Sequence, residues 1–392
     1  MKRTIFKLAV TQMFGQTFTT MILATTALVG TALATDKALA TVPHALGWVS
    51  VALCAIPAAH IMKRYGRLCG FTLGAVTGTA GALIAAYGIV ENSFTLFAVG
   101  MIVIGAFNAT NQQYRFAAAE VADAAYRPRA ISYVVAGGVL AAFLGPELAK
   151  WTKDLMAPME FAGTYFALAA LPVVMIAMLV VTPLPRPAAR GPRRGGRPLR
   201  EIARQPKFVV AALAGMIGWG VMSLVMTTTP LAMVSCGLDF ADAAFVVQWH
   251  ILGMYAPSFF TGALIARFGL PRIMLAGALL QFGCVAAALA GLDVWNFWLA
   301  NVLVGMGWNF LFVGGTALVT ETHTVEERAT VQGFNDFLVF GTVATTSFAS
   351  GWLQNSFGWD VVNYSVLPLI LVAIAAAIWL LRLGAAAPQP AE

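Results

Sequence analysis

Four side chains with sulfur or imidazole ligand atoms recur at one spacing in two consecutive apolar segments. Met222 and Met226 are four residues apart, and so are His250 and Met254. Residues four apart share one face of a helix. Thioethers are soft ligands that favour Cu(I) among the biological metals, and imidazole also suits copper. The spacing therefore indicates a column of three thioethers and one imidazole able to pass a soft cation.

The depths of these residues match when segments 208–234 and 243–266 run antiparallel. Met226 and His250 lie eight and seven residues from the facing ends, and Met222 and Met254 lie twelve and eleven. At about 1.5 Å per residue, each partner lies within about 2 Å of the other's depth. Methionine also fills gaps in helical cores, and this chain has 16 of them. A metal path and ordinary packing both remain open on spacing alone.

The elements that must position these residues are membrane helices. Hydrophobic residues make up 59% of the 392 residues and charged residues only 10%, against about 25% charged in soluble domains. Runs of about 20 apolar residues mark membrane spans. We predict twelve of them, at 6–34, 40–62, 67–90, 94–120, 130–149, 161–184, 208–234, 243–266, 271–292, 296–320, 329–354 and 361–383.

The net charge of +7 favours membrane topology over nucleic acid binding, because the basic residues form short clusters between apolar runs. The clusters alternate with basic-poor loops, which predicts that both termini face the cytoplasm of a bacterial inner membrane. The four cysteines show no disulfide framework. We find no nucleotide-binding loop and no hydrolase or metalloprotease motif, so we do not expect an enzyme.

The chain contains an internal repeat. Arg64-Tyr65-Gly66 recurs as Arg267-Phe268-Gly269, 203 residues later, and Arg129-Ala130 recurs as Arg328-Ala329, 199 residues later. Over its whole length the chain resembles the major facilitator superfamily. The resemblance implies an all-α membrane fold with two six-helix halves, 1–184 and 208–392, joined by a basic cytoplasmic linker, 185–207. Lys63 departs from the family pattern, which usually has an acidic residue there.

The paired methionine and histidine motifs resemble those of CcoA-type copper importers within this superfamily. That resemblance implies Met222, Met226, His250 and Met254 as Cu(I) ligands and import of copper for cytochrome oxidase assembly. Family members also use cysteines near these helices. Here only Cys236 is suitably placed, and an inert loop thiol is the alternative. Copper would be the transported substrate, with no resident cofactor, and we expect a monomer in the lipid bilayer.

The alternative is a riboflavin importer of the related RfnT type. A flavin needs aromatic faces for stacking and amides for its ring edge. Candidate cavity residues are Gln12, Gln16, Asn108, Gln112, Trp219, Gln248, Trp249, Tyr255 and Asn309. Each of them also suits packing or hydrogen bonding between helices.

Three ionisable residues are candidates for gating or coupling. Arg115 would pair with Glu120 or with Asp336 to close the cytoplasmic mouth, or would extend to the interface. Glu147 would carry a coupling proton, or would be solvated beside Lys150.

Overall fold

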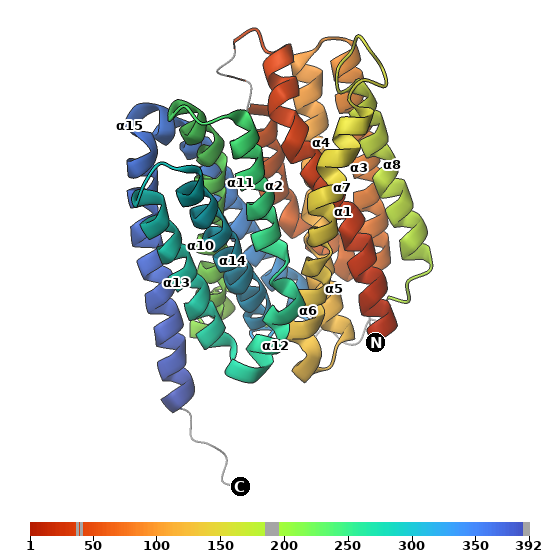
Figure 1. Cartoon of the computed structure of the whole chain (residues 1–392). Helices are drawn as coiled ribbons and strands as arrows, with labels where there is room; N and C mark the ends of the chain where they lie inside the picture. The colour runs from red at the N-terminus through yellow and green to blue at the C-terminus, as the bar shows by residue number, and fades with distance from the viewer. Residues whose placement is uncertain (37–38, 40–41, 185–195, 387–392) are drawn as a thin grey trace. The chain divides into compact units, whose positions relative to one another are not determined.

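In a computed structural model, residues 1–36, 39, 42–184 and 196–386 are described, and this part of the chain is helical without strands (Figure 1). The elements are α1 (Lys2–Leu33), α2 (Val42–Tyr65), α3 (Arg67–Val90), α4 (Phe94–Asn111), α5 (Tyr114–Val121), the short turn η2 (Ala124–Tyr126), α6 (Arg127–Ala136), α7 (Gly138–Thr152), α8 (Ala162–Val180), α9 (Leu199–Ala203), α10 (Pro206–Ser235), α11 (Phe240–Tyr255), α12 (Ser258–Phe268), α13 (Leu270–Leu289), α14 (Val294–Val319) and α15 (Arg328–Ala386).

The predicted all-α fold is confirmed, with some spans divided. Ten helices of the described residues are long and apolar enough to cross a membrane, or 11 with the bent pair α11 and α12 taken as one span. The 59-residue α15 combines the predicted spans 329–354 and 361–383, because its backbone breaks only at Gly358, where φ is 79°. With that division the described helices supply the twelve predicted spans.

The boundaries follow local chemistry where it is strong. Helix α4 begins where predicted, since the Ser93 side chain accepts a hydrogen bond from the Leu96 amide at 3.3 Å and caps the first turn. Helix α10 begins two residues earlier than predicted, with Pro206 in its first turn, where the missing amide hydrogen costs nothing. The first part of the predicted basic linker, 185–195, lies outside the described residues, and the rest of it, up to 207, contains α9.

The described residues form two compact units. Unit 1 comprises 1–123, 133–195 and 326–344. Within it α4 packs against α2 and α3, α3 packs against α8, and α1 packs against α7.

Unit 2 comprises 124–132, 196–325 and 345–392. Within it α14 is central and packs against α10, α11 and α13. The pairs α3–α4 and α13–α14 correspond through the repeat, as do α2–α4 and α11–α14.

The units differ from the predicted sequence halves in two segments. Residues 326–344 come from the second half of the sequence and belong to unit 1, whereas 124–132 come from the first half and belong to unit 2. The second segment is held by Ser132, whose hydroxyl donates to the Ser258 carbonyl and accepts from the Gly262 amide at 3.1 Å.

The internal repeat is visible in the backbone. Gly66 separates α2 from α3 with φ 94° and ψ 161°, and Gly269 separates α12 from α13 with φ 85° and ψ 154°. This region of φ and ψ is open essentially only to glycine. The two motif copies therefore make the same tight connection in each half.

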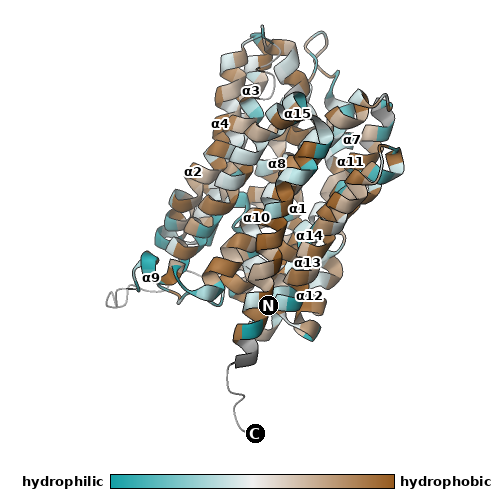
Figure 2. Ribbon diagram, turned by 90° about the vertical axis from the view of Figure 1, so that its left-hand side faces the viewer, coloured by the Kyte–Doolittle hydropathy of each residue, from teal (hydrophilic) through white to brown (hydrophobic). Residues whose placement is uncertain are grey.

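Large apolar side chains cover much of the helical surface. Leu140, Leu371 and Trp379 are exposed, among many others. Figure 2 shows hydrophobic residues along the long helices and hydrophilic residues at several helix ends and loops. Such a surface is stable in lipid and not in water, which agrees with the membrane assignment.

Candidate functional site

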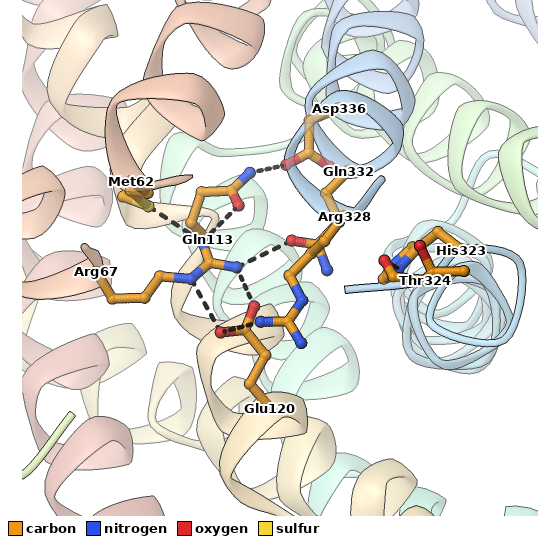
Figure 3. Close-up of polar contacts among 9 residues, drawn as sticks. All are labelled: Met62, Arg67, Gln113, Glu120, His323, Thr324, Arg328, Gln332 and Asp336. Atoms are coloured by element: carbon orange, nitrogen blue, oxygen red, sulfur yellow. Dashed lines mark hydrogen bonds and ion pairs between the residues drawn. The ribbon is translucent and has the colours of Figure 1, made fainter. Parts of the chain in front are cut away.

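A network of charged and amide side chains lies in unit 1, centred on Arg67 at the start of α3 (Figure 3). Its guanidinium pairs with Glu120 of α5 and donates to Gln113 Oε1 at 3.0 Å. It also donates to Gln332 Oε1 of α15 at 2.9 Å. Arg328 lies 3.1 Å from the same Glu120 carboxylate. The network therefore joins α3 and α5 to the first turns of α15.

Arg115 pairs with Asp336, which resolves the two partners that the sequence left open. Both side chains are buried, at 3% and 1% exposure. Gln112 Oε1 accepts a hydrogen bond from the same guanidinium at 3.0 Å. Asp336 also accepts from Gln113 Nε2 at 2.8 Å and from Asn335 Nδ2 at 3.2 Å. A buried ion pair with this many supporting bonds is costly to break by removing one partner.

Lys63, the departure from the family pattern, contacts the same end of α15. Its ammonium donates to the backbone carbonyl of Glu326. A lysine can therefore tie α2 to the segment that precedes α15 without the usual carboxylate.

An amide seam runs between α1 and α4 in unit 1. Gln12 and Gln16 of α1 are buried, at 4% and 8% exposure. Asn108 of α4 is half-buried, and its Oδ1 accepts a hydrogen bond from Thr19 at 3.0 Å. Asn111, one turn further along α4, is 1% exposed and lies against Gly15. The contacts between α1 and α4 in this seam are thus Thr19 with Asn108 and Gly15 with Asn111, and Asn111 was not among the predicted residues.

An aromatic cluster joins α10, α11 and α14 in unit 2. Trp219 and Tyr255 both meet Trp308 edge-on, with ring centroids 5.1 and 5.6 Å apart. Trp308 also stacks on Phe312 at 5.0 Å. Sequence analysis proposed the first two residues and missed Trp308 and Phe312. The sequence did contain a signal for them, because both lie within three residues of Asn309, a polar residue in the middle of the apolar span that forms α14.

Asn309 holds the break between α11 and α12. Its Nδ2 donates to the Met254 carbonyl at 2.6 Å and to Ser258 Oγ at 2.5 Å. Its Oδ1 accepts from Thr261 at 2.7 Å. Both ends of this amide are engaged, so Asn309 positions the helix ends around residues 255–258.

His250 is fully buried in α11 and anchored on α14. Its Nδ1 lies 2.9 Å from the Asn301 backbone carbonyl. A carbonyl only accepts, so Nδ1 carries the hydrogen and the neutral ring presents its lone pair at Nε2. That atom is buried and has no hydrogen-bond partner. An acceptor in this state suits a soft cation or a hydrogen-bond donor from a ligand.

The predicted methionine column keeps its matched depths. With the observed bounds, Met226 lies nine residues from the end of α10 and His250 ten from the start of α11. Met222 and Met254 are buried, and Met226 is half-buried. Depth does not fix lateral separation, and the hydrogen bond of His250 runs to α14 rather than to α10.

Four other candidates lie at the protein surface. Trp249 is exposed and contacts Phe245 and Trp298, away from the Trp219 cluster. Cys236 is exposed at the end of α10 and is a free thiol. Glu147 on α7 and Gln248 on α11 are exposed as well.

The geometry is that of a polytopic membrane protein with two related helical bundles. Comparison with known proteins agrees. The Major Facilitator Superfamily model matches residues 8–256 and 250–392. The chain belongs to the Major Facilitator Superfamily and is a secondary transporter rather than an enzyme.

Named relatives narrow the class. The chain is 41% identical over 391 residues to the riboflavin transporter RfnT of Brucella anthropi, covering 99% of this chain and 98% of that protein. It is 30% identical to the uncharacterized transporter YdeG of Bacillus subtilis, covering 95% and 88%. The human organic anion transporter MFSD10 shares the fold, with a TM-score of 0.78, 13% identity and coverage of 96% and 99%.

Proposed function

We propose that this transporter imports riboflavin or a closely related flavin across the bacterial cytoplasmic membrane. The observation that carries the proposal is the 41% identity to RfnT over 99% of this chain. This favours the riboflavin alternative over the copper importer that the methionine and histidine spacing first indicated.

The residue types within each unit support a flavin. The isoalloxazine ring has flat aromatic faces and one polar edge. Aromatic side chains bind such faces by stacking or edge contacts, and amides bind the edge by hydrogen bonds. Unit 2 by itself contains the aromatic side chains Trp219, Tyr255 and Trp308, and unit 1 by itself contains the amide seam of α1 and α4.

The ion pair of Arg115 and Asp336 is proposed as part of the gate. It joins α5 of the first sequence half to α15 of the second. Any motion that draws those two helices apart must break it. In the proposed topology the basic loops and both termini face the cytoplasm, so this ion pair would lie near the cytoplasmic side of the membrane. The protein is proposed to act as a monomer.

Cu(I) is the second candidate substrate. The observation in its favour is the buried, unpartnered Nε2 of His250, one helical turn from Met254. Met222, Met226 and Cys236 would complete the path. Glu147 is retained as a candidate for proton coupling.

Paired uptake measurements test the two substrates. Cells lacking their own riboflavin and copper importers would carry the wild type, an empty vector, or His250→Ala combined with Met226→Ala. We expect the wild type to take up radioactive riboflavin and the empty vector not to. If the wild type took up radioactive copper but not riboflavin, and the double variant lost copper uptake, Cu(I) would replace riboflavin as the assigned substrate.

A further inference from the structure

Asn111 is a buried amide with nothing to bind. Its side chain lies in α4, within a span, at 1% exposure. Neither Nδ2 nor Oδ1 has a hydrogen-bond partner in this conformation. Buried polar groups are almost always paired, and each exception calls for an explanation, such as a water or a bound group that supplies the missing partner. Both ends of one amide being unpaired is therefore a strong departure.

The neighbouring helix is shaped around this side chain. A Cβ at Gly15 of α1 would lie 2.1 Å from Asn111 Oδ1, so a larger residue there would require the amide to move. Gln12, one turn before Gly15, also has a buried Oε1 with no hydrogen-bond partner. Helix α1 therefore carries an unsatisfied amide atom one turn from the glycine that contacts Asn111.

Hydrogen bonding between helices does not explain Asn111. An amide that holds two membrane helices together bonds across their interface. Thr19 and Asn108 do so, three residues along the same seam, at 3.0 Å. Asn309 of unit 2 does so with both ends of its amide. Asn111 lies in a similar place and forms no such bond.

We propose that Asn111 recognises the imide edge of the transported flavin. The inference rests on the proposed riboflavin function and names the group that the site reads. An imide presents an N–H between two carbonyls. The asparagine Oδ1 would accept from that N–H while Nδ2 donates to an adjacent carbonyl, which satisfies both unpaired atoms at once.

A less buried amide lies one helical turn from Asn111. Asn108 lies three residues before Asn111 on the same face of α4 and is half-buried. Exposure along this face of α4 therefore rises within one helical turn of Asn111.

The test compares riboflavin with riboflavin methylated on the imide nitrogen, which removes the donor and leaves the aromatic faces intact. Competition with radioactive riboflavin uptake gives the affinity ratio of the two. We expect the wild type to prefer riboflavin by about tenfold or more, the equivalent of one good hydrogen bond to a desolvated partner. In Asn111→Leu the ratio should fall close to one, with riboflavin KM raised about tenfold.

The control is Asn363→Leu, which removes another fully buried asparagine with an unpartnered Oδ1, in α15 of unit 2. It should keep the wild-type ratio. If the leucine variant does not fold, the same affinity ratio is measured with Asn111→Ser, which keeps a small polar side chain. The measurement then uses quenching of riboflavin fluorescence by the purified protein. A wild-type ratio retained in both Asn111 variants overturns this assignment. Absence of wild-type riboflavin uptake overturns the proposed function and the assignment with it.

Discussion

The buried ion pair of Arg115 and Asp336 should make a measurable contribution to the free energy of unfolding. Arg115→Met leaves a carboxylate, and Asp336→Leu leaves a guanidinium, in a place where these side chains are 3% and 1% exposed. Removing one partner of a buried pair costs about 3–5 kcal/mol, because the other charge stays desolvated. The double variant leaves neither charge and should cost at most about 1–2 kcal/mol, since apolar replacements of buried pairs are often neutral.

The supporting bonds decide which single variant is worse. Removal of the Asp336 carboxylate takes the counter-ion from Arg115. It also removes the acceptor of the hydrogen bonds that Gln113 and Asn335 donate. Each orphaned donor adds about 1 kcal/mol or more. Asp336→Leu should therefore be the most destabilised of the three variants.

Reversible unfolding in mixed micelles, followed by tryptophan fluorescence, would measure all four members of this cycle. The pair Lys153 and Glu160, 3.4 Å apart and 38% and 63% exposed, is the control within the same chain. Its single variants should cost about 1 kcal/mol or less. If the Arg115 and Asp336 variants behave like this control, or if their costs simply add in the double variant, the desolvated pair described above is refuted.

Three further predictions concern packing and backbone. Gly269→Ala should lower the free energy of unfolding by about 1–3 kcal/mol, because the backbone φ at this position is 85°. The nearest atom to a new Cβ is 3.8 Å away, so backbone strain and not steric crowding would cause the loss. The unfolding midpoint of the purified variant measures it. Gly15→Ala should reduce riboflavin uptake without loss of protein from the membrane, because the methyl group displaces Asn111. Trp308→Ala should cost about 3–5 kcal/mol, and the exposed Trp249→Ala much less, as thermal unfolding of the two purified variants would show.

The membrane spans could be predicted from the sequence because the hydrocarbon core of the bilayer requires a run of about 20 mostly apolar residues. Helix α3 begins and ends where expected, since Gly66 breaks the chain before it and Glu91 follows it. The breaks inside spans were not predicted. At 255–258 the hydropathy is continuous, so one span was predicted, although Pro257 lies in the break and cannot donate a helical hydrogen bond. The hydrogen bonds of Asn309 around the break come from 51 residues beyond Ser258 in the chain, which the sequence does not show.

The site was predicted in part for a related reason. Residue type and depth marked Arg115 as a gating candidate, but its partner Asp336 is 221 residues away, and only the fold chooses between that residue and Glu120. Asn111 was missed because a sequence shows an amide and not whether its hydrogen bonds are made. The methionine and histidine motifs were read from spacing, which gives helix face and depth but not the distance between helices.

The internal repeat connects the amide seam to the aromatic cluster. Gln16 and Trp219 are 203 residues apart, and Asn108 and Trp308 are 200 apart, within the offsets of 199 and 203 that the loop motifs define. Equivalent positions of the two halves therefore carry amides in unit 1 and aromatic rings in unit 2. Duplication alone would leave the same chemistry in both places, so the two halves have diverged at these positions. Amides and aromatic rings are the side chain types that suit a flavin, whereas Cu(I) prefers thiolate, thioether and imidazole ligands.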